Sequence, residues 1–475
     1  MNFDEEYFKS DEFQELLSSY EESMETGSTP FLDVDDLVDI ADYYNYKGNV
    51  GKAVETVDKG LEFFPNDTLL NVFKARQALL RYDFDEARRY ADAIDDKDAP
   101  DYHYLLAEIM IAEGHLDDAD RFLRDLYHTL PSDELKDYVK DVANLYIDYN
   151  VSDKAYEWML RSQGDDSDDF KELMARTLFG LGKYKDSQRL FNELIDRNPY
   201  SKDYWNALAS AQFMDEDYSA SIASSEYAIA IDPADAEGLL SKANGLFKLG
   251  NYDDAIDYYR RYLQQDPGDS FAHLHVGGCL MNIGKTEEAI AELERALRCD
   301  DCDDDVRSQV CQELAFCYAN LHDTDKALAI LDTTRTLDCN HDEMLVLRGH
   351  ILLRAGRLAE AEKAFTQAMR RSDGDLNIIL RIIVSLYENH HVSASYTMFK
   401  RFFELTADDD FPDGYSYMAL CCLELAHPEE FLHYLKEAVA RNPEEARVVL
   451  GHLFPEGMEP AEYYDYMKGR EKIQN

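Results

Sequence analysis

The sequence has few positively charged residues compared with negatively charged ones. Its 475 residues include 48 Lys and Arg against 97 Asp and Glu, a formal net charge of −49. Such a surface repels phosphate backbones and anionic membranes, and it attracts basic partners. We therefore expect no nucleic-acid binding and a partner that is basic or mixed in charge. A plainer interpretation is that the charge keeps a long, open surface in solution.

Cysteine and long apolar runs are also scarce. Eight cysteines are too few for a disulfide scaffold, in keeping with a reducing compartment. No run of about 18 apolar residues is present, so we expect no membrane insertion. The start, "MNFDEEYFKS", is acidic and lacks the apolar segment of a signal peptide. These absences predict a cytoplasmic protein.

Motifs for catalysis or cofactor binding are missing. The stretch "NIGKTEE" (Asn282 to Glu288) contains the Gly-Lys-Thr of a phosphate-binding loop, but Cys279 stands where that motif needs glycine. The sequence has no H-E-x-x-H, no G-x-S-x-G and no paired C-x-x-C. We therefore expect no enzyme, no catalytic residue and no cofactor.

One group of cysteines leaves a metal site open. Cys299 and Cys302 have the spacing that lets two thiolates reach one zinc ion, and Cys339 and His341 follow in the corresponding loop of the next repeat. Most free cysteines of this kind fill space on buried helix faces. The sequence predicts no metal here, but it does not decide whether these four residues bind one.

What the chain does have is a repeat. The stretch "GNYDDAIDYYRRYLQQDPGD" (Gly250 to Asp269) returns along the whole sequence in altered form. One position, usually alanine, recurs every 32 to 38 residues and most often every 34, at Ala53, Ala87, Ala119, Ala155, Ser187, Ser221, Ala255, Ala289, Ala327, Ala361, Ser395 and Phe431. A period this regular predicts a repeat architecture rather than a set of domains.

Each repeat is expected to hold two helices. A small residue stands twelve positions before the marker alanine, as Ala41, Ala243 and Gly277 illustrate. A glycine or polar residue lies between the two helices, and a proline often ends the second, as Gly250 and Pro267 do. One such pair cannot bury its apolar faces alone, so the pairs must stack on one another.

The pattern resembles the tetratricopeptide repeat family. The residues that carry the resemblance in one repeat are Trp205, Leu208, Ala209, Tyr218, Ser221, Ala228 and Pro233. It implies an all-α fold, a right-handed α-solenoid superhelix of stacked antiparallel helix pairs. We expect an N-terminal capping helix over residues 1–33, about twelve repeats forming one continuous superhelix over 34–445, and a C-terminal capping segment over 446–475.

The resemblance also implies a binding surface, because the first helix of each pair lines the concave groove in this family. In repeats 5 to 8 the groove positions hold amides, which can bind a peptide backbone, aromatic rings, and two of the few cations. The candidate groove residues are Arg176, Phe179, Asn206, Phe213, Asn244, Phe247, Lys248 and Asn282. We therefore predict a non-enzymatic protein–protein interaction scaffold that binds an extended peptide or partner protein in this groove.

Two alternatives stay open at this point. The protein could instead be an acidic decoy or chaperone-like protein that attracts a basic partner by its overall negative field. Other groove positions carry carboxylates at Asp42, Glu108, Asp148 and Glu388, which fit an acidic ligand poorly. An uncapped end could also join two copies into a homodimer.

Overall fold

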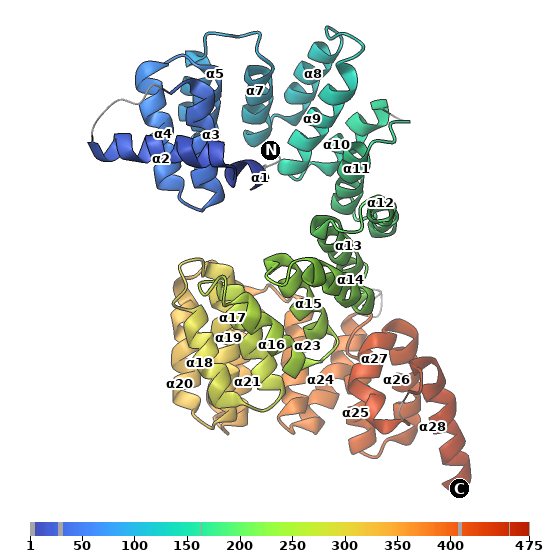
Figure 1. Cartoon of the computed structure of the whole chain (residues 1–475). Coiled ribbons are helices and arrows are strands. Elements are labelled where there is room, and N and C mark those ends of the chain that lie inside the picture. Colours follow the sequence, from blue (N-terminus) through green and yellow to red (C-terminus); the bar gives the residue numbers. More distant parts are fainter. Residues whose placement is uncertain (1–4, 27–31, 163, 407–410, 456, 475) are drawn as a thin grey trace. The chain divides into compact units, whose positions relative to one another are not determined.

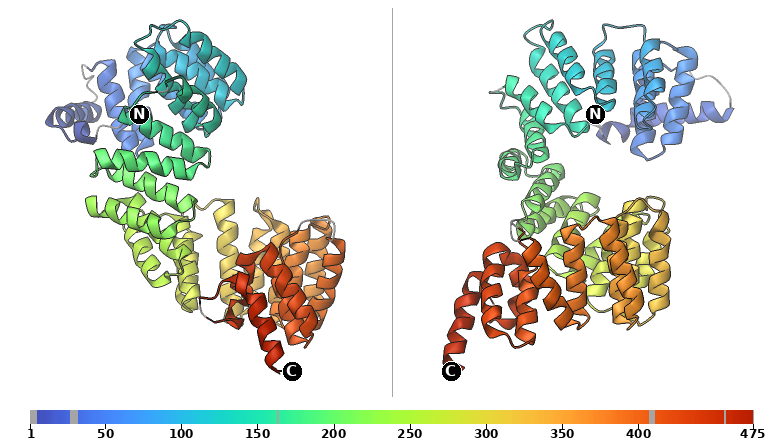
Figure 2. Two further views of the ribbon diagram at one scale, coloured as in Figure 1. Left: turned by 90° about the vertical axis from the view of Figure 1, so that its right-hand side faces the viewer. Right: turned by 180° about the vertical axis from the view of Figure 1, so that it is seen from behind.

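The computed structural model describes residues 5–26, 32–162, 164–406, 411–455 and 457–474. Within these ranges every regular element is a helix, which confirms the predicted all-α solenoid class. The chain divides into two compact units, Met1–Ala220 and Ser221–Asn475, with the division inside one helix. Each unit is a row of helix pairs (Figure 1; Figure 2).

Unit 1 opens with two helices that precede the first pair and continues through six first helices. Its elements are α1 (Glu5–Phe8), α2 (Asp11–Thr26), α3 (Val34–Tyr46), α4 (Val50–Phe63), α5 (Thr68–Leu79), α6 (Phe84–Ala93), α7 (Pro100–Ala112), α8 (Leu116–Tyr127), α9 (Leu135–Asp148), α10 (Ser152–Met159), η1 (Leu160–Ser162), α11 (Asp168–Gly180), α12 (Tyr184–Arg197) and α13 (Lys202–Met214).

The division between the units falls in α14 (Tyr218–Ile231). Unit 2 continues with α15 (Ala236–Lys248), α16 (Tyr252–Tyr262), α17 (Ser270–Asn282), α18 (Thr286–Ala296), α19 (Asp304–Asn320), α20 (Thr324–Thr333), η2 (Thr334–Thr336), α21 (His341–Arg354), α22 (Leu358–Arg371), α23 (Leu376–Glu388), α24 (Val392–Leu405), α25 (Tyr415–Glu424), α26 (Pro428–Arg441), α27 (Pro443–Leu450), η3 (Gly451–Leu453) and α28 (Pro460–Gln474). In chain order, α3 to α26 therefore form twelve consecutive pairs.

Short acidic and amide side chains begin many of these helices. At each such N-cap, a side-chain oxygen accepts a hydrogen bond from a backbone N–H of the first turn, which would otherwise lack a partner. Caps of this kind are formed by Asp33, Asn49, Asp67, Asp83, Asp235, Asp269, Asp303, Asp323, Asn340, Asp375 and Asn442. Part of the acidic excess thus has a local structural role.

The turn between the two helices of each pair has one residue in the left-handed region of backbone space. Its φ lies between 57° and 83° in all twelve pairs. Half of these residues are glycine, which tolerates this conformation, and half carry a side chain. They are Gly48, Tyr82, Gly114, Asn150, Gly182, Glu216, Gly250, Gly284, His322, Gly356, His390 and Ala426. Each stands five residues before a marker position, so the sequence period has a direct backbone counterpart.

The core consists of the small residues that face each other within a pair. The alanines among the marker positions and among the small residues twelve positions earlier have no exposed surface. Where the first helix has glycine the approach is closest: a Cβ on Gly349 would lie 2.3 Å from the ring of Phe365. At two of the three marker serines the hydroxyl donates across the pair, from Ser187 Oγ to the Ala175 carbonyl at 2.8 Å and from Ser395 Oγ to the Ile383 carbonyl at 3.0 Å.

The first helices form the inner layer of each unit. They pack directly on one another, α3 on α5, α5 on α7 and α7 on α9 in unit 1, and α17 on α19, α19 on α21 and α21 on α23 in unit 2. Among the residues that the structure describes, no two successive second helices are in comparably close contact. A row of pairs that touch on one side and separate on the other is curved, so the first helices line the concave face.

The helices before the twelve pairs cover the start of unit 1, and the helices after them cover the end of unit 2. In α2, Phe13, Leu17 and Tyr20 are buried, and the Tyr20 hydroxyl donates to Thr56 Oγ1 on α4 at 2.9 Å. At the other end, α28 packs on α26 and α27, and Tyr463 stacks on Phe454 with ring centroids 3.7 Å apart. The continuous superhelix that the sequence predicts across both units stays a prediction.

Candidate interaction surface

The eight predicted groove residues fall into two sets of four, one in each unit. In unit 1, Arg176 and Phe179 lie on α11, and Asn206 and Phe213 lie on α13. In unit 2, the four residues are Asn244, Phe247 and Lys248 on α15 and Asn282 on α17. All eight are on first helices, of which α11 packs on α9 and α17 packs on α19.

The three predicted phenylalanines also have a role inside their own repeats. Each ring makes an edge-to-face contact with the tyrosine that begins the second helix, five residues later. The ring centroids are 5.7 Å apart for Phe179 and Tyr184, 5.2 Å for Phe213 and Tyr218, and 5.8 Å for Phe247 and Tyr252. This contact recurs every 34 residues and holds the turn between the helices. Each ring therefore offers a ligand only its remaining surface.

The predicted asparagines differ in how much they offer. Asn206 is only 1% exposed, so a ligand would have to displace its neighbours to reach it. Asn244 Oδ1 accepts a hydrogen bond from the Tyr259 hydroxyl at 2.6 Å. Asn282 is exposed, and its amide donates to the Gly278 carbonyl at 2.9 Å. Of the three, Asn282 is the most accessible to a partner.

Both predicted cations are exposed. Arg176 and Lys248 extend from α11 and α15 with solvent-accessible side chains. Lys248 lies near a half-buried imidazole that the sequence does not single out, that of His275 on α17. Burial, and then the charge of Lys248, lower the pKa of His275 to about 4, so this ring is neutral near pH 7.

His275 belongs to an aromatic cluster on the inner face of unit 2. Its ring contacts Phe271 edge-on at 4.2 Å and Phe247 at 5.1 Å, and it stacks on Tyr259 at 5.6 Å with planes 6° apart. Phe271 is 42% exposed, so the cluster opens to solvent on one side. A spacing rule based on single repeats could not find it, because the four rings come from three helices.

Carboxylates dominate the inner layer of unit 1. Burial raises the pKa of Asp42 on α3, of Asp141 on α9 and of Glu172 on α11. For Asp42 and Glu172, which are half-buried, a raised pKa of this origin means that the surroundings hydrate the negative charge poorly, whereas Asp141 is exposed and accepts a hydrogen bond from the Tyr104 hydroxyl at 2.9 Å. The neighbouring Glu108 is balanced instead, since Arg76 Nε donates to it at 2.9 Å and the Tyr149 hydroxyl at 3.3 Å.

Unit 2 has two carboxylates of the same kind. Burial raises the pKa of Glu313 on α19 and of Glu388 on α23. The Glu388 carboxylate lies 3.7 Å from Nδ1 of His350, whose pKa is lowered by burial and then by Arg354. The Glu388 side chain is 47% exposed, and Glu313 is half-buried. In both units the first helices thus carry carboxylates whose charged form burial disfavours, and a cation brought beside them would be favoured.

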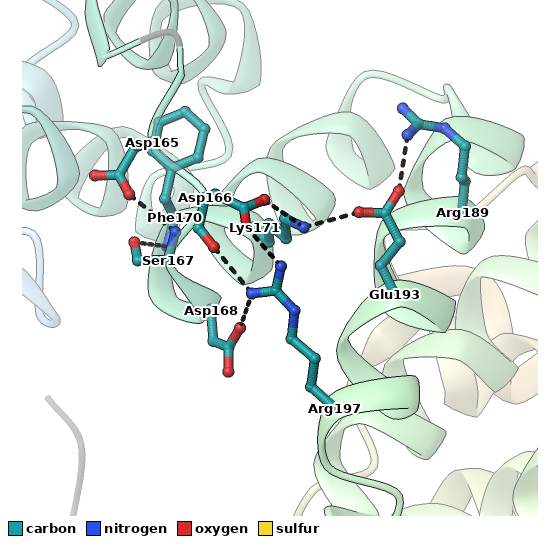
Figure 3. Close-up of polar contacts among 9 residues, drawn as sticks. All are labelled: Asp165, Asp166, Ser167, Asp168, Phe170, Lys171, Arg189, Glu193 and Arg197. Atoms are coloured by element: carbon teal, nitrogen blue, oxygen red, sulfur yellow. Dashed lines mark hydrogen bonds and ion pairs between the residues drawn. The ribbon is translucent and has the colours of Figure 1, made fainter.

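The acidic loop before α11 is compensated within the protein (Figure 3). Asp166 accepts from Lys171 at 2.7 Å and from Arg197 at 2.8 Å, and Arg197 also pairs with Asp168 at 2.5 Å. These hydrogen bonds lower the pKa of Asp166. The loop therefore joins the start of α11 to the end of α12, and its carboxylates are engaged without a bound ion.

Of the four residues that the sequence leaves open as metal ligands, the structure brings Cys339 and His341 together. Cys339 Sγ lies 3.8 Å from His341 Nδ1, and Cys302 is buried. Burial raises the pKa of Cys299, Cys302 and Cys339, which keeps the thiols protonated. Across the described part of the chain, no three His, Cys, Asp or Glu side chains are grouped so that they could hold a metal ion.

In the described ranges, all helices are too short or too polar to cross a lipid bilayer.

Comparison with known proteins supports the repeat assignment. Sequence models described as tetratricopeptide repeat match residues 173–236, 246–308 and 318–375. A probable UDP-N-acetylglucosamine–peptide N-acetylglucosaminyltransferase, SEC of Arabidopsis thaliana, is 29% identical over 130 residues, which are 26% of this chain. The matched part covers only 13% of the length of that transferase.

Solved structures resemble the chain at low similarity. MamA (residues 41 to the end) from Desulfovibrio magneticus RS-1 gives a TM-score of 0.34 at 15% identity, covering 36% of this chain and 94% of that one. The APC/C hetero-tetramer Cut9-Hcn1 gives a TM-score of 0.36 at 15% identity, covering 94% of this chain and 93% of that one.

Proposed function

The chain belongs to the tetratricopeptide repeat family, whose arrays are protein-interaction scaffolds, and we propose that its concave inner layer binds an extended, basic segment of a partner protein. The observation that carries this proposal is the set of carboxylates on the first helices whose pKa is raised by burial: Asp42, Glu172 and Glu313 are half-buried, and Asp141 and Glu388 are exposed. Lysine or arginine side chains of a partner would restore the lost charge stabilisation at these positions.

The predicted groove residues have supporting roles in this proposal. Asn282 offers an exposed amide to a peptide backbone, and Phe247 with Phe271 offers apolar surface beside it. Arg176 and Lys248 would receive an acidic side chain of a partner of mixed charge. Asn206, Asn244, Phe179 and Phe213 contribute less, because each is already enclosed or packed within its own unit.

We propose a binding role without catalysis and without a cofactor, in the cytoplasm. The match to the Arabidopsis transferase is confined to 130 residues, a small part of that protein. Transferase activity is therefore not carried over to this chain. The charge of −49 supports a protein partner over a nucleic acid, since it repels phosphate backbones.

The first test compares inner and outer carboxylates. An Asp141→Asn/Glu172→Gln variant removes two inner-layer charges of unit 1. An Asp92→Asn/Asp125→Asn variant removes two exposed charges from the second helices α6 and α8. Binding of a degenerate library of lysine-containing peptides would be measured by fluorescence anisotropy at about 300 mM salt, where distant charges are screened.

We expect the inner variant to bind about tenfold more weakly than the wild type, and the outer variant to bind within about twofold of it. Equal losses in both variants would instead favour the acidic decoy, which acts through the total field. The decoy would also lose its binding between about 50 and about 300 mM salt, whereas contact with the inner layer would largely persist. A degenerate library with serine in place of lysine is the negative control.

A further inference from the structure

Four cationic side chains gather in unit 2 where η2, the first helix α21 and the second helix α22 meet. A cleft of about 620 Å³ lies between α20 and α22, with α21 as its floor. Its cationic lining residues are Arg335, Arg348, Lys363 and Arg371. Two carboxylates, Asp332 and Glu360, line it as well. In a chain of net charge −49, a cleft with a cationic excess is a local reversal of sign.

The cations of this cleft are only partly compensated. Asp332 Oδ1 accepts from two guanidiniums at once, Arg335 Nη2 at 2.8 Å and Arg348 Nη1 at 2.7 Å. Glu360 is engaged by Arg357, which lies outside the lining, at 2.7 Å. Arg371 Nε donates to Asp342 Oδ1 at 2.9 Å, whereas Lys363 forms no ion pair among the described residues. One carboxylate shared by two arginines leaves donor capacity that an incoming anion can use.

The floor of the cleft is apolar. Leu331, Met344, Leu352 and Ala364 are buried beneath the charged rim. The cleft exists because successive second helices separate on the outer side of the stack. An anion that carries an organic group therefore gains both ion pairs at the rim and apolar contact at the floor.

We propose that this cleft binds a phosphorylated side chain of a partner polypeptide. A phosphomonoester carries close to two negative charges and three acceptor oxygens, which suits several separate cationic donors. A carboxylate would only duplicate Asp332 at the two guanidiniums. A polyanion such as nucleic acid is disfavoured, because the acidic residues Asp325, Asp342 and Glu362 surround the cationic cluster.

The test uses a degenerate peptide library with one fixed phosphoserine, and the matched libraries with serine or glutamate at that position. Binding to the full chain is measured by fluorescence anisotropy at about 150 mM salt, with inorganic phosphate as competitor. An Arg335→Glu/Lys363→Glu variant reverses two charges of the cleft. A Lys285→Glu/Lys326→Glu variant reverses two exposed charges of unit 2 that do not line it.

We expect the phosphoserine library to bind about tenfold tighter than the serine library, and this advantage to be lost in the cleft variant but kept in the control. The methyl resonance of Met344, assigned with a Met344→Leu variant, should shift on binding because this side chain lines the floor. Thermal unfolding would verify that both variants fold.

Three results would overturn the proposal. One is equal affinity for the phosphoserine and serine libraries. Another is equal or tighter binding of the glutamate library, which would assign the cleft to acidic peptides. The third is complete displacement by inorganic phosphate at an affinity equal to that of the peptides, which would assign it to the free ion. None of these outcomes depends on the inner layer, so the two binding proposals can fail separately.

Discussion

At the scale of single residues, the left-handed turn positions are the places where the presence of a Cβ atom changes stability. Ala426 has a φ of 58° and an exposed side chain, so its Cβ is strained and makes little compensating contact. The left-handed conformation costs an L-residue roughly 1–2 kcal/mol, and a glycine there would remove this strain. Glycine also makes the unfolded chain more flexible, which costs about 0.5–1 kcal/mol of stability. We expect Ala426→Gly to raise the free energy of unfolding by about 0.5–1 kcal/mol, measured as a higher urea midpoint.

The matching control is the same substitution in a helix. Ala291 is exposed in the middle of α18, where glycine costs about 1 kcal/mol relative to alanine. The Ala291→Gly variant should therefore lower the urea midpoint. A shift in the same direction for both variants would mean that the backbone strain at the turn is not the controlling factor.

Some single-residue roles could be predicted from the sequence and others could not. The twelve turn positions were predictable, because their spacing repeats and their backbone requirement is local. The roles of Phe179, Phe213 and Phe247 were not, because a groove position does not reveal that its ring already packs on a tyrosine of the same repeat. A tyrosine at the fifth following position in all three cases was the available signal.

At the scale of elements, the packing of α15, α16 and α17 depends on a neutral imidazole. The pKa of His275 is about 4 in the folded protein, against about 6.5 for an unperturbed histidine. Between these values the unfolded chain binds a proton that the folded one does not, so stability is full above about pH 6.5 and falls as the pH is lowered towards 4. At about 1.4 kcal/mol per pKa unit, the loss is on the order of 3 kcal/mol.

The measurement is urea unfolding of the wild type and of His275→Phe between pH 7 and pH 4. Phenylalanine keeps an aromatic ring among Phe247, Tyr259 and Phe271 but does not titrate. The difference in stability between the two proteins should change with pH, while the contribution of the many carboxylates cancels. Parallel pH profiles would show that His275 does not control the packing of these helices.

The element scale also marks the limit of sequence-based prediction for binding sites. Helix pairs follow from periodicity, but the cationic cleft joins Arg335 on η2, Arg348 on α21 and Lys363 on α22. These three side chains come together only because of the distance between neighbouring second helices. That distance cannot be derived from the residue spacing within one repeat. The inner carboxylates were partly predictable, since Asp42 and Glu388 occupy groove positions, whereas the burial that raises their pKa depends on how the repeats stack.

At the scale of the whole molecule, the charge of −49 opposes the folded state. Repulsion among like charges acts over distances of about a Debye length, which is about 10 Å at 0.1 M salt and about 3 Å at 1 M. The surface ion pairs that salt also weakens contribute only about 0–1 kcal/mol each. The same repulsion is what a basic partner would relieve, so screening by salt and binding of a cationic segment should stabilise the chain in similar ways.

We therefore expect the unfolding temperature to rise by several degrees as sodium chloride is raised from about 20 mM to about 500 mM, because screening removes more repulsion than ion pairing. Differential scanning calorimetry measures this slope. A variant with four exposed carboxylates of second helices changed to lysine, Asp92, Asp125, Glu287 and Glu288, keeps the inner layer but reduces the net charge. Its slope should be smaller than that of the wild type. A temperature that falls with salt would mean that ion pairs such as those of Arg197 outweigh the overall repulsion.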